Sequence, residues 1–434
     1  MKHRFKFALT AFLALPLLGG CGGGTADDLL GHVRLVNATT EYTGLDLAAG
    51  ASAVSANVAS YAAGSFATLD PGTISFNLKA TGSSATSATT SQSATKNAYN
   101  TIVAYTTGGT LTTAYLSDNE AAPSAGTAKL RVFNTASTDA GKVDIYVIDT
   151  ECASLATSAA AAITTGVEGL QTSYAQVSAA AAGSTYHLCV TAAGDKTDLR
   201  LDVPALTLTD QQIATLILAR GAGGVLLNGL VLNQRGALSV ARNTSVRMRV
   251  AASAVASGSV TASANGVSLG IGFVSPAVGP YRLVAAGPLA LSVTINNAPV
   301  TAPASLAGMA GADLTLLVAG SAAAPAISLI GDDNTVSASS VKPVKLRLVN
   351  GLNGVAGPVT LTVDNSQVGE AAAFGTTSAA GIVAASAALA QLDAVQAGND
   401  LARLADVTLT SGSVYTFFLL GDMAAPKSIL RVDR

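Results

Sequence analysis

The sequence contains the same strand-like opening four times, and this repetition constrains the fold more than any other feature. Each opening places an arginine among apolar residues, as in Val33-Arg34-Leu35-Val36-Asn37, and the other three openings carry Arg131, Arg249 and Arg347. Consecutive arginines are separated by roughly one hundred residues, which is the size of a small β-sandwich and larger than a solenoid repeat. The repetition therefore predicts tandem β-sandwiches.

Two further segments recur in every unit. A second strand-like run, in which apolar and polar residues alternate, follows each opening, and these runs begin at Leu45, Val143, Val260 and Val359. Such alternation is typical of a half-buried strand. Each unit then ends with two apolar runs joined by a turn of Gly, Ala or Pro, such as "IATLILARGAGGVLLNGLVLNQ" in the second unit. We interpret this ending as a closing β-hairpin.

These patterns predict an all-β chain of four tandem immunoglobulin-like or transthyretin-like β-sandwich domains. The turns at Pro123, Arg242 and Val341 separate the units. The expected domains are residues 29–124, 125–242, 243–340 and 341–434. Two alanine-rich stretches, Ala159 to Thr165 and Ala379 to Ala390, are compatible with short helices or with loops.

The opening of the second unit, Lys129 to Asp149, reads "KLRVFNTASTDAGKVDIYVID". It resembles the bacterial domain-of-unknown-function family 4397, whose units open with a stretch like "LRVVHASPDAPAVDVYVDG". The resemblance extends to four divergent copies, of which the second and fourth match best and the third lacks the Asn after its first strand. It implies an exported or surface-attached β-protein and brings no established chemistry.

The first residues form an export signal. Lys2, Arg4 and Lys6 are a basic head, and the apolar run from Phe7 to Leu18 is too short for a stable membrane span. Leu18-Gly19-Gly20-Cys21 then matches the lipobox of bacterial lipoprotein precursors. We expect residues 1–20 to be a lipoprotein signal peptide and residues 21–28 to be a lipidated, glycine-rich tether.

Lipidation is expected at Cys21, because in lipoproteins of this pattern the cysteine thiol receives a diacylglyceryl group. Two or three acyl chains anchor a protein stably, since each buried CH₂ contributes about 0.8 kcal/mol. Gly22 follows the cysteine, so no Asp is present there to retain the protein at the inner membrane. The expected location is the outer membrane, on its periplasmic or cell-surface face.

The remaining cysteines, Cys152 and Cys189, are expected to form a disulfide, because an exported protein folds in an oxidising compartment. Both lie at the ends of strand-like runs that could lie side by side, and two free buried thiols are the alternative. Charged residues are only 12% of the chain and the formal net charge is −2, which argues against a nucleic-acid partner. The apolar segment from Ile213 to Leu232 is interrupted by Arg220 and several glycines, so we interpret it as a hairpin.

Catalytic or metal sites are not predicted. His3 is lost with the signal, His32 and His187 lack a recognisable nucleophile motif nearby, and two histidines with an oxidised cysteine pair make a zinc site improbable. Asp46 and Asp144 occupy equivalent strand positions, and we expect them to pair with the arginines of the opening strands. No catalytic residue, cofactor or metal is assigned.

Two acidic clusters, Ser117-Asp118-Asn119-Glu120 and Gly331-Asp332-Asp333-Asn334, lie at unit junctions. We interpret them as polar turns, with calcium binding as the alternative because Ca²⁺ prefers oxygen ligands. The functional expectation is a non-enzymatic cell-envelope lipoprotein with a structural, adhesion or interaction-scaffold role. Its partners are the membrane, through the lipid anchor, and an envelope protein or glycan. The alternative is a surface protein with glycan- or calcium-dependent ligand binding.

Overall fold

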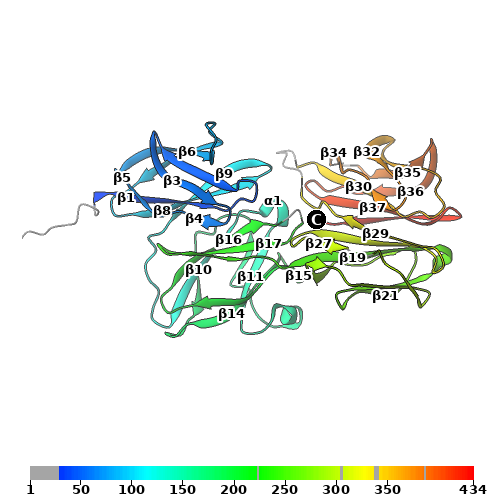
Figure 1. Cartoon of the computed structure of the whole chain (residues 1–434), viewed down its shortest axis with the longest axis horizontal. Helices are drawn as coiled ribbons and strands as arrows, with labels where there is room; N and C mark the ends of the chain where they lie inside the picture. The colour runs from blue at the N-terminus through cyan, green and yellow to red at the C-terminus, as the bar shows by residue number, and fades with distance from the viewer. Residues whose placement is uncertain (1–28, 222–223, 304–305, 337–341, 386–387) are drawn as a thin grey trace, which may run out of the picture.

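The computed structural model describes residues 29–221, 224–303, 306–336, 342–385 and 388–434. These residues form four β-sandwiches in chain order, which confirms the predicted fold class (Figure 1). The expected signal peptide, Cys21, the tether and the junction at Val341 lie outside the described residues. Each sandwich consists of two sheets, which we call the inner and the outer sheet.

The inner sheet contains the opening strand and the closing hairpin. Its core strand order is β4-β1-β8-β9 in the first sandwich, and the same order recurs as β13-β10-β16-β17, β22-β19-β28-β29 and β33-β30-β37-β38. The bounds in the first two sandwiches are β1 (Gly31–Asn37), β4 (Ala62–Ala63), β5 (Ala67–Leu69), β8 (Tyr99–Thr107), β9 (Thr110–Ser117), β10 (Thr127–Asn134), β13 (Ala175–Ser178), β16 (Ile213–Arg220), β17 (Leu227–Asn233) and β18 (Leu238–Ala241). In the last two they are β19 (Ser245–Ala254), β22 (Ala277–Val278), β23 (Arg282–Ala285), β28 (Asp313–Gly320), β29 (Pro325–Gly331), β30 (Val344–Asn350), β33 (Thr376–Thr377), β34 (Gly381–Val383), β37 (Val414–Asp422) and β38 (Ala425–Val432).

The outer sheet is a four-stranded antiparallel sheet with a recurring order, β3-β2-β6-β7 in the first sandwich. Its counterparts are β12-β11-β14-β15, β21-β20-β25-β26 and β32-β31-β35-β36. The bounds are β2 (Gly44–Ala49), β3 (Ser52–Ala59), β6 (Gly72–Ala80), β7 (Ala88–Ala94), β11 (Val143–Ile148), β12 (Thr164–Val167), β14 (Ser184–Ala192), β15 (Asp195–Leu208), β20 (Ser259–Ala264), β21 (Val267–Val274), β25 (Leu291–Ile295), β26 (Ala298–Val300), β31 (Val359–Val363), β32 (Ser366–Ala372), β35 (Ala390–Gln396) and β36 (Asn399–Val407). A two-stranded sheet, β24 (Gly287–Pro288) with β27 (Ala307–Gly308), completes the third sandwich.

Helical structure among the described residues is short. It comprises α1 (Ser137–Ala140), η2 (Cys152–Thr157) and η3 (Val255–Ser257). The two alanine-rich stretches contain loop and short strands where the structure describes them, rather than helices. Within the described ranges, no helix is long and apolar enough to cross a membrane.

The sandwiches pack in two pairs, the first on the second and the third on the fourth (Figure 1). The inner sheets face each other within a pair, so their strands are buried on both faces. Along β1, Val33 and Leu35 contribute to the core of the first sandwich, whereas Val36 packs against Phe133 and Ile217 of the second. In the other pair, Ala251 and Val349 lie in one shared cluster. Each pair therefore has one hydrophobic core inside each sandwich and a third hydrophobic cluster between the two sandwiches.

Candidate functional site at the sandwich interfaces

The arginine of each opening strand has the same neighbour in all four sandwiches. The opening strand runs parallel to the first strand of the closing hairpin, and this register aligns Arg34 with Thr101. The same register pairs Arg131 with Thr215, Arg249 with Thr315 and Arg347 with Thr416. In every case the arginine Nε donates to the threonine Oγ1, over 2.8 to 2.9 Å. This arginine–threonine pair is the repeated polar unit of the fold.

A buried acid completes the unit in three of the four sandwiches. Asp118, Asp332 and Asp433 directly follow the closing strand, and each accepts a hydrogen bond from the threonine of its own sandwich. Burial raises the pKa of Asp118, while Thr101 and Arg34 act in the opposite direction. Gln234 takes the place of this acid in the second sandwich, where it exchanges hydrogen bonds with the backbone of Glu120 in the first.

The guanidinium groups extend across the interface within each pair. Arg34 Nη1 donates to Gly236 O in the second sandwich at 2.5 Å, and Arg131 Nη2 donates to Ser117 O in the first at 2.9 Å. The two contacts are reciprocal, because each arginine reaches the end of the partner's closing hairpin. A reciprocal arrangement of this kind is typical of a two-fold interface.

The third and fourth sandwiches are joined by a denser network. Arg249 binds Asp433 of the fourth sandwich with both terminal nitrogens, and Arg347 Nη2 lies 3.2 Å from Asp332 Oδ1 of the third. Arg347 also donates to Asp433 Oδ2 at 3.0 Å. The four side chains are at most 3% exposed. Two buried cations are thus neutralised by two buried carboxylates, and the interface carries no excess charge from this cluster.

The expected pairing of Asp46 and Asp144 with the opening-strand arginines is wrong. The opening-strand arginines point to the interface between sandwiches, whereas the second strand of each unit lies in the outer sheet, on the far side of the sandwich core. Asp46 instead accepts hydrogen bonds from Asn57 N and Thr81 Oγ1. Asp144 accepts hydrogen bonds from Gly166 N and Gly194 N, both at 2.8 Å. Each aspartate therefore links the neighbouring edge strand, at Asn57 or Gly166, to a turn.

Carboxylates of both acidic junction clusters form ion pairs with lysine or arginine side chains of the same chain. Asp118 and Asp332 belong to the buried networks described above. Lys129 binds Glu120, and Lys345 lies 2.5 Å from Asp333 Oδ2. Since their carboxylates already face ammonium or guanidinium groups, these clusters form ion pairs rather than open oxygen sites.

A pocket of about 920 Å³ lies where the second, third and fourth sandwiches meet. Arg247 and Arg249 contribute to its wall, and the ring of Tyr281 lies 4.4 Å from each guanidinium carbon. Arg247 is held by Asp313 through two hydrogen bonds of 2.7 and 2.8 Å. Beside it, burial lowers the pKa of Arg200 to about 10. The wall of the pocket is part polar and part apolar, and Arg247 and Arg249 in it are both paired with aspartates.

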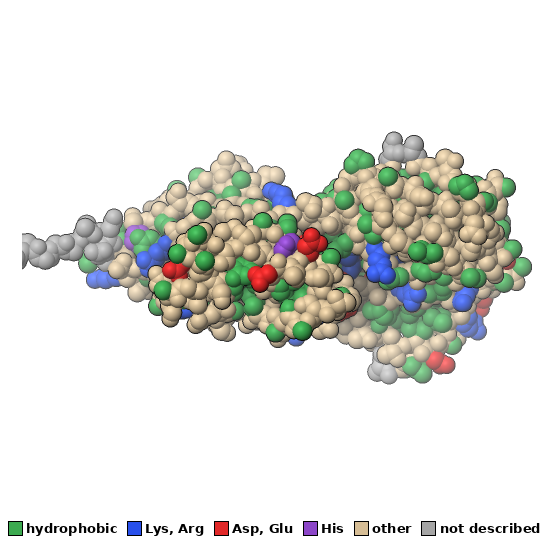
Figure 2. All heavy atoms as spheres, turned by 90° about the horizontal axis from the view of Figure 1, so that it is seen from below, with side chains coloured by type: hydrophobic (Ala, Val, Ile, Leu, Met, Phe, Trp, Pro, Cys, Tyr) green, Lys and Arg blue, Asp and Glu red, His purple; other side chains and the backbone are tan. Residues whose placement is uncertain are grey.

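The chain end closes this junction. Arg434 Nη2 donates to Ser137 O of α1 at 2.6 Å, which ties the fourth sandwich to the second. Accordingly, the C-terminus lies at the centre of the molecule, between the two pairs (Figure 1). On the face shown in Figure 2, charged side chains are sparse among uncharged side chains and backbone. Some Lys and Arg side chains lie near the boundary between the two halves of the molecule.

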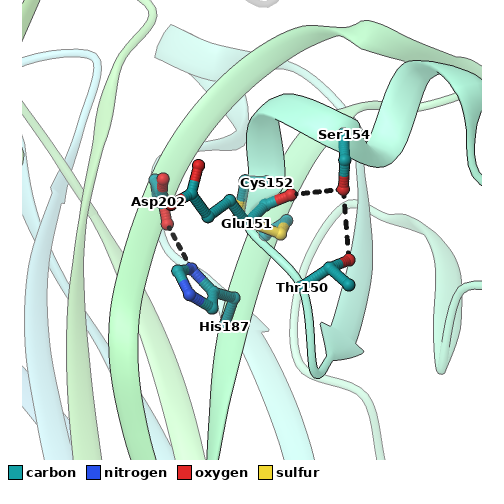
Figure 3. Close-up of a disulfide and its surroundings, with 7 residues drawn as sticks. Thr150, Glu151, Cys152, Ser154, His187 and Asp202 are labelled. Carbon is teal, nitrogen blue, oxygen red and sulfur yellow. Dashed lines mark hydrogen bonds and ion pairs between the residues drawn. A yellow bond between two sulfur atoms is a disulfide. The ribbon is translucent and has the colours of Figure 1, made fainter.

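The expected disulfide between Cys152 and Cys189 is present, with Cα atoms 5.6 Å apart. It joins η2 to β14 on the outer sheet of the second sandwich (Figure 3). His187 lies on the same strand, and its Nδ1 is 3.6 Å from Asp202 Oδ1. Ser154 donates to Glu151 O and contacts Thr150, away from His187, so these residues do not form a Ser-His-Asp triad (Figure 3).

The other described histidine, His32, is buried and stacks on Tyr99 with ring centroids 4.0 Å apart. It is a packing residue of the first sandwich. The sequence analysis did not predict that arginine, threonine and acid form one network. It identified the arginines and the acidic clusters separately. The recurring threonine of the closing hairpin and the acid after that hairpin are at matching places in three units.

Similar proteins are found among solved structures but not among curated proteins. A structure titled as a "putative cell adhesion protein" from Bacteroides uniformis is 13% identical, with a TM-score of 0.22, and the match covers 48% of this chain and 98% of that one. The TIE protein of Bacillus anthracis is 11% identical, with a TM-score of 0.15, covering 92% of this chain and 69% of that one. At TM-scores this low, neither similarity carries an argument about fold or role.

A family model gives the firmer result. Its match begins at Gly31, in the opening strand of the first sandwich, and ends at Tyr146, in β11 of the second. It therefore includes both openings with Arg34 and Arg131. Residues 31–146 match the family described as a domain of unknown function, DUF4397, which confirms over this range the resemblance expected from the sequence.

Proposed function

We propose that the chain is a non-catalytic cell-envelope lipoprotein whose four sandwiches act as a structural or adhesive scaffold. One observation carries the proposal. The arginine that recurs in all four units is buried and reaches the partner sandwich, so it helps to hold each pair together. A repeated binding or catalytic site would instead expose its recurring polar groups to a ligand.

The lipid anchor is part of this proposal. Lipidation at Cys21, with export to the outer membrane, would tether the scaffold by the short segment 21–28. The first sandwich then stands nearest the membrane, and the partner is an envelope protein or a glycan. A calcium-dependent role is less well supported, because the carboxylates that suggested it are bound to arginine or lysine.

The test compares point variants with deletion of a whole pair, in cells that express the full lipoprotein. Deleting residues 243–434 removes the third and fourth sandwiches together and leaves the first pair with its own interface. We expect this deletion to weaken attachment of the cells to envelope glycan or to neighbouring cells, while the truncated protein stays in the outer-membrane fraction.

Asp144→Ala and His187→Ala serve as the matched point variants, because both residues are polar and neither lies in the pair interfaces. We expect both variants to keep the location and the attachment of wild type. Loss of a measurable activity in either variant, with folding intact, would contradict the non-catalytic proposal. Unchanged attachment after the deletion of residues 243–434 would contradict the scaffold role of the second pair.

A further inference from the structure

The pocket of about 920 Å³ is built from three sandwiches together. The second sandwich contributes the beginning of β15, the third contributes the edge strands β22 and β23, and the fourth contributes the end of β38. Sites for organic ligands typically have volumes of about 300–1,000 Å³ and often lie between domains. The size and position of the pocket are therefore those of a site for an organic molecule rather than for a single ion.

Arg431, in the wall of this pocket, departs from the repeat. In the other closing hairpins, the residue opposite the recurring threonine is Leu116, Leu232 or Ile330, and all three are buried between paired sandwiches. In the fourth sandwich the residue opposite Thr416 is Arg431, and it is exposed. An apolar interface position is thus an arginine only where the strand borders the pocket.

Arg282, also in the wall, departs from the repeat in the same way. The residue before each recurring arginine is paired across the inner sheet with Ala67 in the first sandwich, Ala175 in the second and Gly381 in the fourth. In the third sandwich the corresponding partner of Met248 is Arg282. This position therefore carries a small residue in every sandwich except the one whose strand borders the pocket.

Both arginines keep donor groups free. Arg282 is exposed and forms no hydrogen bond or ion pair with any residue that the structure describes. Arg431 Nη2 donates to Val278 O at 2.7 Å, and its Nε and Nη1 have no partner within the described ranges. Arg247 and Arg249, by contrast, are paired with aspartates. The pocket therefore presents two cations that have no carboxylate partner.

The wall from the second sandwich is acidic. Asp195 accepts hydrogen bonds from Thr197 Oγ1 and Thr197 N, and both bonds lower the pKa of its carboxyl group, so Asp195 is ionised at neutral pH. Asp202 lies 3.6 Å from His187. Neither aspartate forms an ion pair with a lysine or arginine of the described chain. A ligand that fills the pocket must therefore offer an anionic group to the arginines and hydrogen-bond donors to the aspartates.

A sugar that carries a carboxylate meets both requirements. Its carboxylate can accept two parallel hydrogen bonds from a guanidinium group, and its hydroxyl groups can donate to the aspartates. An acidic peptide would instead bring further carboxylates towards Asp195 and Asp202, where like charges repel each other. Pro280 and Val432, which is 65% exposed, add apolar surface to the wall for the face of a sugar ring.

We propose that this pocket binds an oligosaccharide of uronic acids, with Arg282 and Arg431 at a carboxylate and Asp195 at hydroxyl groups. The inference rests on the proposed function, because it specifies the glycan partner as an acidic one and places its site at the junction of the two pairs. It also gives the second pair a direct part in recognition, since two walls of the pocket belong to that pair.

The test uses the full-length lipoprotein in detergent micelles and titration calorimetry with trisaccharides of galacturonate and of mannuronate. Galactose and mannose trisaccharides are their uncharged counterparts. We expect one site per chain for at least one uronate trisaccharide, and binding of its uncharged counterpart that is about tenfold weaker or more, because hydrogen bonds between charged groups contribute at least that factor. Penta-glutamate tests the peptide alternative, and binding as tight as that of the uronates would overturn the proposal.

The variants exchange each arginine for a residue of the other units. Arg431→Leu and Arg282→Ala introduce residues found at these positions elsewhere in the chain, so both should fold, and each should weaken uronate binding about tenfold or more. Lys427→Ala is the matched control, because Lys427 is an exposed cation on β38 outside the pocket wall. Absence of uronate binding to wild type, wild-type affinity in the folded double variant, or an equal loss in Lys427→Ala would overturn the proposal.

Cells that express the lipoprotein separate this inference from the scaffold proposal. The double variant Arg282→Ala with Arg431→Leu should reduce attachment to a uronate-bearing glycan as much as deletion of residues 243–434 does. Full attachment of the double variant, with attachment lost on deletion, would overturn the pocket inference and leave the scaffold proposal standing. Unchanged attachment after the deletion would contradict the scaffold role of the second pair, whereas uronate binding by the purified protein would still support the pocket.

Discussion

Replacement of Asp433 by Asn should destabilise the pair of the third and fourth sandwiches strongly. The carboxylate accepts hydrogen bonds from Arg249, from Arg347 and from Thr416, and its side chain is 1% exposed. The asparagine amide removes the negative charge and presents N–H groups to donors. Breaking a buried ion pair on one side costs about 3–5 kcal/mol, because the remaining charge is left without compensation. Asp332 still faces Arg347, so we expect the lower end, about 3 kcal/mol.

The measurement is urea unfolding of the full chain, followed by hydrogen exchange of peptides from β28, β29, β37 and β38. With a denaturant slope of about 1–3 kcal/mol per molar urea, a loss of 3 kcal/mol lowers the midpoint for these peptides by about 1–3 M. Peptides from β8 and β9 report on the first pair, which does not contain Asp433, and should keep their protection.

Asp400→Asn provides the control within the same sandwich. Asp400 Oδ2 lies 2.7 Å from Arg403 Nη2, but both side chains are 52% exposed. Water screens such a pair, so its removal should leave the midpoint almost unchanged. The reasoning fails if Asp433→Asn shifts the midpoint no more than Asp400→Asn does, because buried pairing would then contribute nothing measurable to the interface.

Four further changes test other parts of the structure. Tyr281→Phe removes the hydroxyl that donates to Asp332 Oδ2 at 2.6 Å and should cost about 1–3 kcal/mol of unfolding free energy in thermal melts. Gly351→Val would place its Cβ 2.8 Å from Leu317 Cδ1, between the third and fourth sandwiches, and overpacking should cost about 1–3 kcal/mol in the same assay. Replacing Cys152 and Cys189 together by Ser should cost about 2–5 kcal/mol, measured by urea unfolding. Cys21→Ala should block processing, seen as a larger precursor on gels and as loss of the protein from the outer-membrane fraction; normal processing of this variant would contradict the lipobox prediction.

The elements of each sandwich could be predicted from the sequence because they depend on local patterns. The second strands alternate apolar and polar residues, as at Val260, and Val260 and Ala262 do point into the core. The closing hairpins were visible as two apolar runs around a turn, and β16 and β17 form the hairpin expected between Ile213 and Leu232. The disulfide followed from counting cysteines and from the oxidising compartment.

The pairing of sandwiches was not predicted, although a signal for it exists. A strand with one buried face alternates, whereas the closing strands read almost continuously apolar, as in "IATLILAR" of β16. Continuous runs indicate burial on both faces. In β16, Leu216 faces the core of its own sandwich and Ile217 faces the first sandwich. The apolar residues on the second face of the closing strands therefore indicate that another sandwich covers this face.

The expected arginine partners were wrong because the strand that follows the opening strand in sequence is not its neighbour in the sheet. The opening strand β1 pairs with β8, about seventy residues later, and that pairing brings Arg34 to Thr101. Only a comparison of all four units shows that arginine and threonine recur in every unit and the acid in three of them. The second unit, with Gln234 in place of the acid, breaks the pattern and hides it further.

The location of the recurring residues indicates where a ligand could be recognised. Arginine and threonine recur in all four units; the threonine holds the arginine, and the arginine contacts the partner sandwich, so repetition in this chain marks assembly rather than chemistry. Recognition must then depend on residues that differ between units. The outer sheets carry such differences, since the cluster of Cys152, His187 and Asp202 lies on the outer sheet of the second sandwich. Replacing the outer-sheet surface of one unit by that of another should therefore alter binding, whereas replacing an interface arginine by alanine should alter only stability.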